Sequence, residues 1–289
     1  MFKAVFLSIV AACFSCGSWG AIALGSAHAV VVDEMTGEVL IEKNPSTAAP
    51  IASLTKLMTA MVVLDAGQDP NEAIRIEPAD MDRLKRSRSG VPVGAVVSRG
   101  TLIELALIAS DNHAAAALAR SYPGGADNFA LATDRKIRDL GLEHTALTEP
   151  TGLSPGNRSS ALDMAKVLQA TSAYPVIAQI TSQRAHQVIV NGRLWSVRNT
   201  NRLVGKPGWQ ILASKTGFTN DAGRCLTMRI QEAGRTFLVV LIGAAAPSAR
   251  SLDALAIRRW LGRQTALRGP ADGPSPAPLA AASARAGSP

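Results

Sequence analysis

The segment that decides the fold is Pro50-Ile51-Ala52-Ser53-Leu54-Thr55-Lys56-Leu57-Met58-Thr59. Proline is common at the start of a helix, and the apolar residues from Ser53 to Asp65 predict a helix there. The three-residue spacing of Ser53 and Lys56 places both side chains on one face of that helix. A serine hydroxyl becomes a strong nucleophile only when a base accepts its proton, and a lysine with a lowered pKa can be that base. Ser53 is therefore the candidate nucleophile and Lys56 its candidate base.

Two shorter motifs follow this segment along the chain. Ser110-Asp111-Asn112 interrupts a helical run, where a loop leading into a cleft would stand, although alone these residues are typical of a helix N-cap. Lys215-Thr216-Gly217 stands at the end of a predicted strand, where glycine allows a ligand to approach the backbone, although alone it indicates only a turn. Each motif is weak by itself, but their order and structural contexts favour one catalytic site.

Together, S-x-x-K, S-D-N and K-T-G resemble the motif set of penicillin-binding proteins and serine β-lactamases. Further segments are similar to the low-molecular-mass D-alanyl-D-alanine peptidases and, among these, to the D-alanyl-D-alanine endopeptidases. They are Val31-Val32-Asp33, Thr36-Gly37-Glu38-Val39-Leu40, Asn199-Thr200-Asn201-Arg202-Leu203-Val204, Gly208-Trp209-Gln210 and Ala222-Gly223-Arg224-Cys225-Leu226. The similarity extends over about residues 26–262, so it bears on nearly the whole chain.

The resemblance implies an α+β fold of the β-lactamase/transpeptidase type, with an antiparallel sheet flanked by helices and an inserted helical subdomain. The sequence pattern agrees, because strand-like segments lie towards both ends of the chain and helical segments lie between them. We expect one serine DD-peptidase domain over residues 24–265, with the sheet part at about 24–60 and 185–265 and the helical insert at about 61–184. The predicted strands are 29–33, 38–42, 185–190, 211–214, 225–231 and 235–242, and a predicted helix covers 246–264.

The N-terminal residues 1–23 are typical of a secretory signal peptide, with Lys3 followed by an apolar run too short to span a membrane comfortably. Cleavage after Ala23 and cleavage after Ala29 both fit the small-x-small pattern, and Cys13 offers lipidation as an alternative. We favour cleavage after Ala23, because a cut after Ala29 would remove part of the first predicted strand. The expected location is the periplasm, with at most peripheral membrane association.

The composition narrows the function classes. Of all residues, 47% are hydrophobic and 18% are charged, which excludes wholesale disorder, although residues 266–289 are dominated by Pro, Ala, Gly and Ser and are expected to form a disordered tail. The net charge of +8 permits an anionic partner, but with 4% aromatic residues and no phosphate-binding loop we expect no nucleic acid partner. The four histidines lack metal-ligand spacing, so we expect no metal and no cofactor. Cys225 is expected to pack as a small hydrophobic side chain.

By the same resemblance, Ser53 attacks the carbonyl carbon of a D-alanyl peptide bond while Lys56 accepts its proton. Ser110 relays a proton to the leaving amine, and Asn112 holds the backbone amide of the substrate. Water then hydrolyses the acyl-enzyme. β-Lactam antibiotics would act as inhibitors, because they acylate the same serine and leave slowly.

The resemblance implies substrate binding for the third motif and the residue that follows it. Lys215 and Thr216 bind a carboxylate or polar terminus, and Gly217 gives the ligand room to approach. The backbone N–H of Phe218 and that of the nucleophile form the oxyanion hole. The positive charge of Lys215 is expected to help keep Lys56 neutral.

The implied function is a periplasmic serine DD-peptidase that hydrolyses D-alanyl peptide bonds of peptidoglycan, as a DD-endopeptidase acting on cross-links. Its partners are the peptide stems of peptidoglycan. Three alternatives are a D-alanyl-D-alanine carboxypeptidase, a class A-like β-lactamase and a non-enzymatic β-lactam sensor. A β-lactamase needs a glutamate that activates water, and Glu149 lacks the expected E-x-x-L-N spacing. A sensor is normally attached to transmembrane signalling segments, and the sequence shows no such pattern.

One further motif is misleading. Gly152-Leu153-Ser154-Pro155-Gly156 matches the G-x-S-x-G pattern of a nucleophile elbow. That elbow uses the backbone N–H of the residue after the serine for its oxyanion hole, and Pro155 has no N–H. We therefore interpret this segment as a turn.

Overall fold

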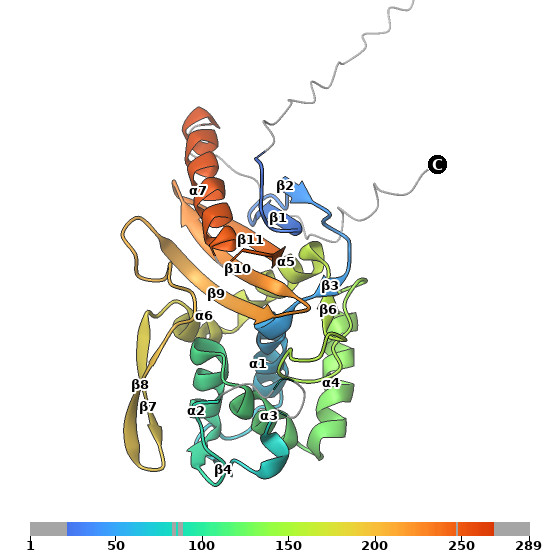
Figure 1. Ribbon diagram of the computed structural model, residues 1–289, viewed down its shortest axis with the longest axis vertical. Coiled ribbons are helices and arrows are strands. Elements are labelled where there is room, and N and C mark those ends of the chain that lie inside the picture. Colours follow the sequence, from blue (N-terminus) through green and yellow to red (C-terminus); the bar gives the residue numbers. More distant parts are fainter. Residues whose placement is uncertain (1–21, 83–84, 86–88, 247, 269–289) are drawn as a thin grey trace, which may run out of the picture.

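An antiparallel five-stranded sheet forms one half of the molecule (Figure 1). This computed structural model describes residues 22–268 except 83–84, 86–88 and 247, so all but the last two residues of the predicted signal peptide and all but the first three of the predicted tail lie outside the described residues. The strand order is β2-β1-β11-β10-β9, with every neighbouring pair antiparallel. The strands are β1 (His28–Asp33), β2 (Val39–Lys43), β9 (Gln210–Thr219), β10 (Gly223–Glu232) and β11 (Arg235–Ala244).

Both faces of the sheet are covered, and the interior strand β1, between β2 and β11, shows why. Its valines alternate between the faces: Val30 and Val32 belong to the hydrophobic cluster shared with the helical half, whereas Val31 belongs to a second cluster. Helix α7 (Ala249–Arg268) covers the second face with Ile257, Trp260 and Leu261. Helix α5 (Ala161–Ala170) packs against β1, β10 and β11 on the first face. An apolar run such as that of β1 therefore marks a strand buried on both sides.

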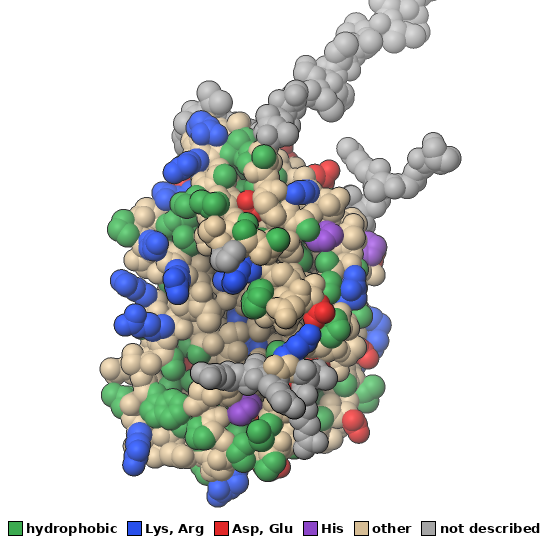
Figure 2. Space-filling view, in the orientation of Figure 1, with side chains coloured by type: hydrophobic (Ala, Val, Ile, Leu, Met, Phe, Trp, Pro, Cys, Tyr) green, Lys and Arg blue, Asp and Glu red, His purple; other side chains and the backbone are tan. Residues whose placement is uncertain are grey.

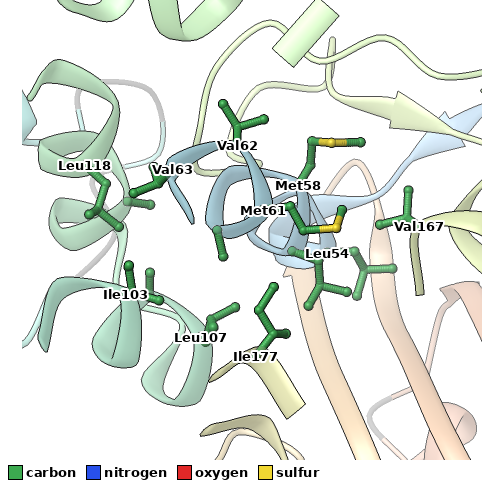
Figure 3. Close-up of a cluster of buried hydrophobic side chains, with 14 of the residues drawn as sticks. Leu54, Met58, Met61, Val62, Val63, Ile103, Leu107, Leu118, Val167 and Ile177 are labelled. Carbon is green, nitrogen blue, oxygen red and sulfur yellow. The ribbon is translucent and has the colours of Figure 1, made fainter. Parts of the chain in front are cut away.

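Helix α1 (Thr55–Asp65) runs through the middle of the helical half and is buried along most of its length. A helix that is apolar on all sides belongs inside a protein, and its neighbours enclose it (Figure 1). Its neighbours include η3 (Leu105–Ala109), α3 (Asn112–Arg120), α4 (Gly125–Asp139) and α5. Helices α2 (Arg99–Glu104) and α6 (Pro175–Thr181) add side chains to the same core. Figure 3 shows the side chains that meet in this core, among them Met58, Met61, Val62, Val63, Ile103, Leu107, Leu118 and Ile177.

The remaining elements are short. The 3-10 turns are η1 (Ala52–Leu54), η2 (Pro78–Asp80) and η4 (Thr171–Ala173). The small strand pairs are β3 (Ala49–Pro50) with β6 (Arg158–Ser159), β4 (Ala73–Arg75) with β5 (Val96–Ser98), and β7 (Ala185–Val190) with β8 (Arg193–Arg198). None of the helices in the described part of the chain is both long and apolar enough to cross a bilayer.

The α+β prediction is confirmed, but the predicted division into a sheet part and a helical insert needs correction. Strands β7 and β8 form a separate hairpin beside the helical half instead of joining the main sheet, so the C-terminal sheet part begins at β9 (Figure 1). Val188 and Val190 of β7 pack into the helical core, which holds the hairpin there. Helix α5, predicted within the insert, covers the sheet. Sequence alternation marks a strand but does not name its partner, which explains the error.

Three element boundaries also differ from the prediction. Strand β9 continues to Thr219, so the K-T-G motif lies within the strand and not at its end. Helix α1 begins at Thr55, and Ser53 lies in the 3-10 turn before it. Helix α7 extends to Arg268, past the predicted start of the tail at Ala266.

Candidate active site

Ser53 and Lys56 meet as the helical spacing predicts. Turn η1 presents Ser53 at the start of α1, after Ala52 has adopted a left-handed backbone with φ of 48°. The Lys56 Nζ donates a hydrogen bond to Ser53 Oγ at 2.9 Å. It also donates to Asn112 Oδ1 and to the backbone carbonyl of Thr151, both at 2.6 Å. The amine is thus held by three acceptors, one of which is the candidate nucleophile.

The environment of Lys56 suits a base. Its side chain is fully buried, and burial lowers its pKa from 10.5 to about 7. The nearby carboxylates of Glu149, Asp111 and Asp82 act in the opposite direction and raise the pKa, but burial is the larger effect. A lysine with this pKa can exist in either protonation state near neutral pH, as proton transfer to and from Ser53 requires.

The S-D-N motif divides its residues between two tasks. Asp111 is the N-cap of α3, because its side chain accepts a hydrogen bond from the Ala114 N–H, and it also binds Ser89 Oγ and Gly90 N. Ser110 has φ of 60°, a left-handed backbone that turns its side chain towards β9. Its Oγ accepts a hydrogen bond from Lys215 Nζ at 2.8 Å. The motif is therefore a helix cap and a site element at once.

Lys215 lies on β9, opposite Lys56. Its side chain is buried, and its Nζ donates to Ser110 Oγ and to the Thr216 carbonyl. Burial lowers its pKa well below 10.5, and the positive charges of Lys56 and Arg250 lower it further. Burial is the largest cause of the low pKa of Lys56, and repulsion between the two amines is mutual, so the expected contribution of the Lys215 charge to the neutrality of Lys56 stays a prediction.

The rest of the third motif brings β9 close to the nucleophile. A Cβ at position 217 would lie 2.9 Å from the Ile51 carbonyl oxygen and 3.0 Å from the Ser53 nitrogen, so only glycine fits without a shift. The Phe218 side chain is half exposed, and the guanidinium of Arg224 lies 4.6 Å from its ring centroid. Strand β9 is thus packed directly against the backbone of Ser53.

Two contacts of β9 involve residues that the sequence analysis missed. Thr216 Oγ1 donates to Thr200 Oγ1 at 2.7 Å. The Arg250 guanidinium, at the start of α7, donates to the carbonyls of Gly217 and Cys225, each at 3.0 Å. Arg250 belongs to no recognisable motif, and Thr200 was quoted only as part of the segment 199–204 that resembles the endopeptidases. Neither was given a role, because each acts through a contact between segments that are distant in sequence.

The carbonyl of Thr151 was also missed, and it belongs to a turn that begins at Glu149. Both carboxylate oxygens of Glu149 accept hydrogen bonds from this turn, including those from the N–H groups of Thr151, Gly152 and Leu153. The G-x-S-x-G segment that follows is a turn as expected, in which Ser154 Oγ accepts from Gly156 N at 3.1 Å. A backbone carbonyl leaves no signature in sequence, so only the folded structure could identify this contact.

A pocket adjoins the site on the helical side. Its lining includes Asn112, Thr151, Leu153, Met81 and Asp82.

On the face in Figure 2, Lys and Arg side chains gather mainly along the left edge, over the sheet and α7, and outnumber acidic side chains. Within the described ranges, His, Cys, Asp and Glu form no group of three that could hold a metal ion.

Comparisons with known proteins identify the family of this chain. The family model described as D-alanyl-D-alanine carboxypeptidase matches residues 18–246. A D-alanyl-D-alanine endopeptidase of Pseudomonas aeruginosa is 40% identical over 248 residues, covering 84% of this chain and 80% of that protein. A D-alanyl-D-alanine endopeptidase of Escherichia coli is 38% identical over 240 residues, covering 82% of this chain and 77% of that protein.

A solved structure agrees with the fold. The crystal structure of a D-alanyl-D-alanine carboxypeptidase from Mycobacterium tuberculosis has a TM-score of 0.77 and 26% sequence identity, covering 85% of this chain and 94% of that one. The likeness therefore extends over both the sheet and the helical half.

Proposed function

Since the chain belongs to the D-alanyl-D-alanine carboxypeptidase family of serine hydrolases, we propose that it is a periplasmic DD-endopeptidase that cleaves D-alanyl cross-links of peptidoglycan through an acyl-enzyme on Ser53. The observation that carries this proposal is the contact of Lys56 Nζ with Ser53 Oγ at 2.9 Å, in a buried setting that lowers the lysine pKa to about 7. A nucleophile hydrogen-bonded to a buried base is the arrangement that nucleophilic catalysis needs.

In the acylation step, Lys56 accepts the Ser53 proton as Oγ forms a bond to the carbonyl carbon of the D-alanyl residue. The N–H groups of Ser53 and Phe218 stabilise the oxyanion. The C–N bond then breaks, and the leaving amine takes the proton that Lys56 accepted, relayed through Ser110, so that Lys56 is neutral again. Ser110 is hydrogen-bonded to Lys215. Water attacks the ester in the second step, and Lys56 serves again as base.

Substrate binding uses both walls of the site. Asn112, which is fixed by its bond to Lys56, is expected to hold the backbone amide of the peptide stem. Lys215 and Thr216 are expected to bind a carboxylate or polar terminus of the substrate. The space that Gly217 leaves beside Ser53 lets the scissile bond lie against β9.

The first test is covalent labelling with a fluorescent penicillin, since a β-lactam acylates the same serine. We expect the purified protein to be labelled, with the adduct on the peptide containing Ser53, and Ser53→Ala to be unlabelled. Labelling that persists in a folded Ser53→Ala variant contradicts the proposal. Deacylation is expected to be slow, whereas a class A-like β-lactamase would release the drug quickly and a sensor would not turn it over.

A D-alanyl-D-alanine carboxypeptidase is the second candidate, and the description of the matching family model favours it. The relatives with 40% and 38% identity are both endopeptidases, which supports the first candidate. Purified cross-linked muropeptides separate the two. An endopeptidase converts the dimer to monomers, whereas a carboxypeptidase releases the terminal D-alanine and leaves the dimer intact, as mass spectrometry would detect.

The periplasmic location rests on the predicted signal peptide, and the contacts of residues 24–26 support cleavage after Ala23. The N–H groups of Gly25 and Ser26 each donate to the Asp253 carboxylate at 2.8 Å, and Lys43 Nζ donates to the Leu24 carbonyl. Cleavage after Ala29 would remove these contacts together with the start of β1. Mass measurement of the secreted protein is expected to place its N-terminus at Leu24.

A further inference from the structure

Glu149 lies beside the site but takes no part in the mechanism given above. Its Oε2 accepts hydrogen bonds from the N–H of Thr151 at 2.7 Å and from the hydroxyl of the same residue at 2.5 Å. Its Oε1 accepts from the N–H groups of Gly152 at 2.6 Å and Leu153 at 2.8 Å. The carboxylate thus gathers successive donors of its own turn, residues 149–154, and fixes the backbone of that turn around itself.

The 149–154 turn touches the base and the nucleophile. The carbonyl of Thr151 accepts a hydrogen bond from Lys56 Nζ at 2.6 Å. Gly152, with φ of 84°, packs so closely that a Cβ there would lie 2.0 Å from the Ala52 carbonyl oxygen and 2.9 Å from the Ser53 nitrogen. One short turn therefore supports both the amine of the base and the backbone of the nucleophile.

The turn is also tied to α1 itself. The carbonyl of Pro150 accepts a hydrogen bond from Thr59 Oγ1 at 2.7 Å. Asn157 Nδ2 donates both to the carbonyl of Glu149 at 2.8 Å and to Thr55 Oγ1 at 3.2 Å. A change in the shape of the turn would consequently move the Thr151 carbonyl relative to the helix that carries Lys56.

We propose that Glu149 is a positioning residue for acylation: its carboxylate shapes the turn that holds the Thr151 carbonyl on Lys56 and the Gly152 backbone against Ser53. This role rests on the proposed function, in which Lys56 is the base. In this role Glu149 supports acylation without activating a water molecule. Both of its oxygens already accept hydrogen bonds within the turn.

The charge of Glu149 gives the role a second readout. The charged groups that face Lys56 are Glu149 from this turn, Asp111 at the start of α3, Asp82 after η2, and Lys215 from β9. Among the carboxylates, Glu149 raises the pKa of Lys56 most. Neutralising Glu149 therefore lowers the pKa of Lys56. The acidic limb of the pH profile, the range in which the acylation rate falls as the pH falls, then shifts to lower pH, an effect that loss of packing alone would not give.

The experiment compares wild type, Glu149→Gln, Glu149→Ala and the control Glu143→Gln, which makes the same charge change at an exposed position. The rate of acylation by a fluorescent penicillin is measured from pH 5 to 9, with thermal unfolding of each variant alongside. For Glu149→Gln we expect an acidic limb lower by about one pH unit and a maximal rate lower by about tenfold. Glu149→Ala is expected to lose more of the maximal rate, and Glu143→Gln to match wild type.

The outcomes separate the two claims. If the wild type is not acylated at Ser53, the proposed function is wrong. If the wild type is acylated and Glu149→Gln follows its pH profile, the role of Glu149 is wrong. Should neither Glu149 variant fold, Thr151→Val removes one hydrogen bond to the carboxylate and leaves the charge in place. It is expected to lower the maximal rate without moving the acidic limb, and an unchanged maximal rate would overturn the proposal.

Discussion

Two buried lysines face each other across the site, Lys56 on α1 and Lys215 on β9, and their surroundings differ. Lys56 has carboxylates near it, and its pKa is about 7. Lys215 has the cations Lys56 and Arg250 near it, and its pKa is lowered by them in addition to burial. Both amines are buried, and the charges that the fold places around each of them differ in sign.

We propose that this contrast gives the two lysines different roles, Lys56 as the base and Lys215 as the group that binds an anion. The carboxylates around Lys56 partly offset its burial, which keeps both of its protonation states accessible near neutral pH. Lys215 lacks such compensation in the described structure, and we expect a substrate carboxylate to supply it. A base needs the first setting, and an anion-binding group gains affinity from the second.

The largest effect is expected from Lys56→Met. Loss of the base should slow acylation of Ser53 by about 10²–10⁴-fold above pH 7, where Lys56 is neutral, because no other amine contacts Ser53 Oγ in the described residues. The rate of labelling by a fluorescent penicillin measures this. Lys206→Met, at an exposed position, is the matched control and should label at the wild-type rate. A loss below tenfold would mean that Lys56 is not the base.

Lys215→Met should have a smaller effect and a different signature. The variant loses the charge-assisted bond to substrate and the bond to Ser110 Oγ, so acylation should fall by about ten- to a hundredfold. The acidic limb should move to higher pH, because removal of a positive charge near Lys56 raises the pKa of Lys56. A limb that stays near pH 7 in this variant would show that burial and the carboxylates alone set the pKa of Lys56.

The pH dependence of the wild type tests the comparison without mutation. Lys56 accepts a proton only when it is neutral, and the fraction of neutral amine falls as pH falls through its pKa of about 7. The acylation rate should therefore decline by about tenfold for each pH unit well below 7. Initial rates in buffers of constant ionic strength give the profile, and a flat profile from pH 5 to 8 would contradict the assignment.

The smallest effect is expected from a substitution of Cys225 on β10, the strand next to β9 in the sheet. Cys225 pairs with Gly217, is fully buried, and has its pKa raised to about 11 by burial. Cys225→Ser should lower the free energy of unfolding by about 1 kcal/mol, because a hydroxyl replaces a thiol in an apolar site. Acylation should stay within about twofold of wild type. Chemical denaturation and labelling measure the two quantities, and lost acylation in a folded variant would give this position a role in catalysis.

Sequence sufficed for the residues whose chemistry depends on a fixed local spacing. Ser53 and Lys56 are one helical turn apart, so their contact followed from the helix prediction. The capping role of Asp111 was also visible as a local pattern. These predictions needed no knowledge of distant contacts.

Contacts between distant segments could not be predicted in the same way. The Thr151 carbonyl meets Lys56 from 95 residues away and carries no side-chain signature. Strand β8 was missed because its sequence, Arg-Leu-Trp-Ser-Val-Arg, does not alternate regularly between polar and apolar residues. The charges that surround each lysine, Glu149 near Lys56 and Arg250 near Lys215, required the positions of these residues in space.

The left-handed backbones of Ala52 and Ser110 have a consequence for engineering. A residue other than glycine in this backbone conformation lowers the free energy of unfolding by about 1–3 kcal/mol, whereas the free energy of unfolding of a whole protein is of the order of 5–15 kcal/mol. Selection for higher melting temperature alone would favour changes that relax these two positions. Because they direct Ser53 and Ser110 into the site, such thermostable variants are expected to lose activity, and a screen for robust forms of this enzyme should hold both positions fixed.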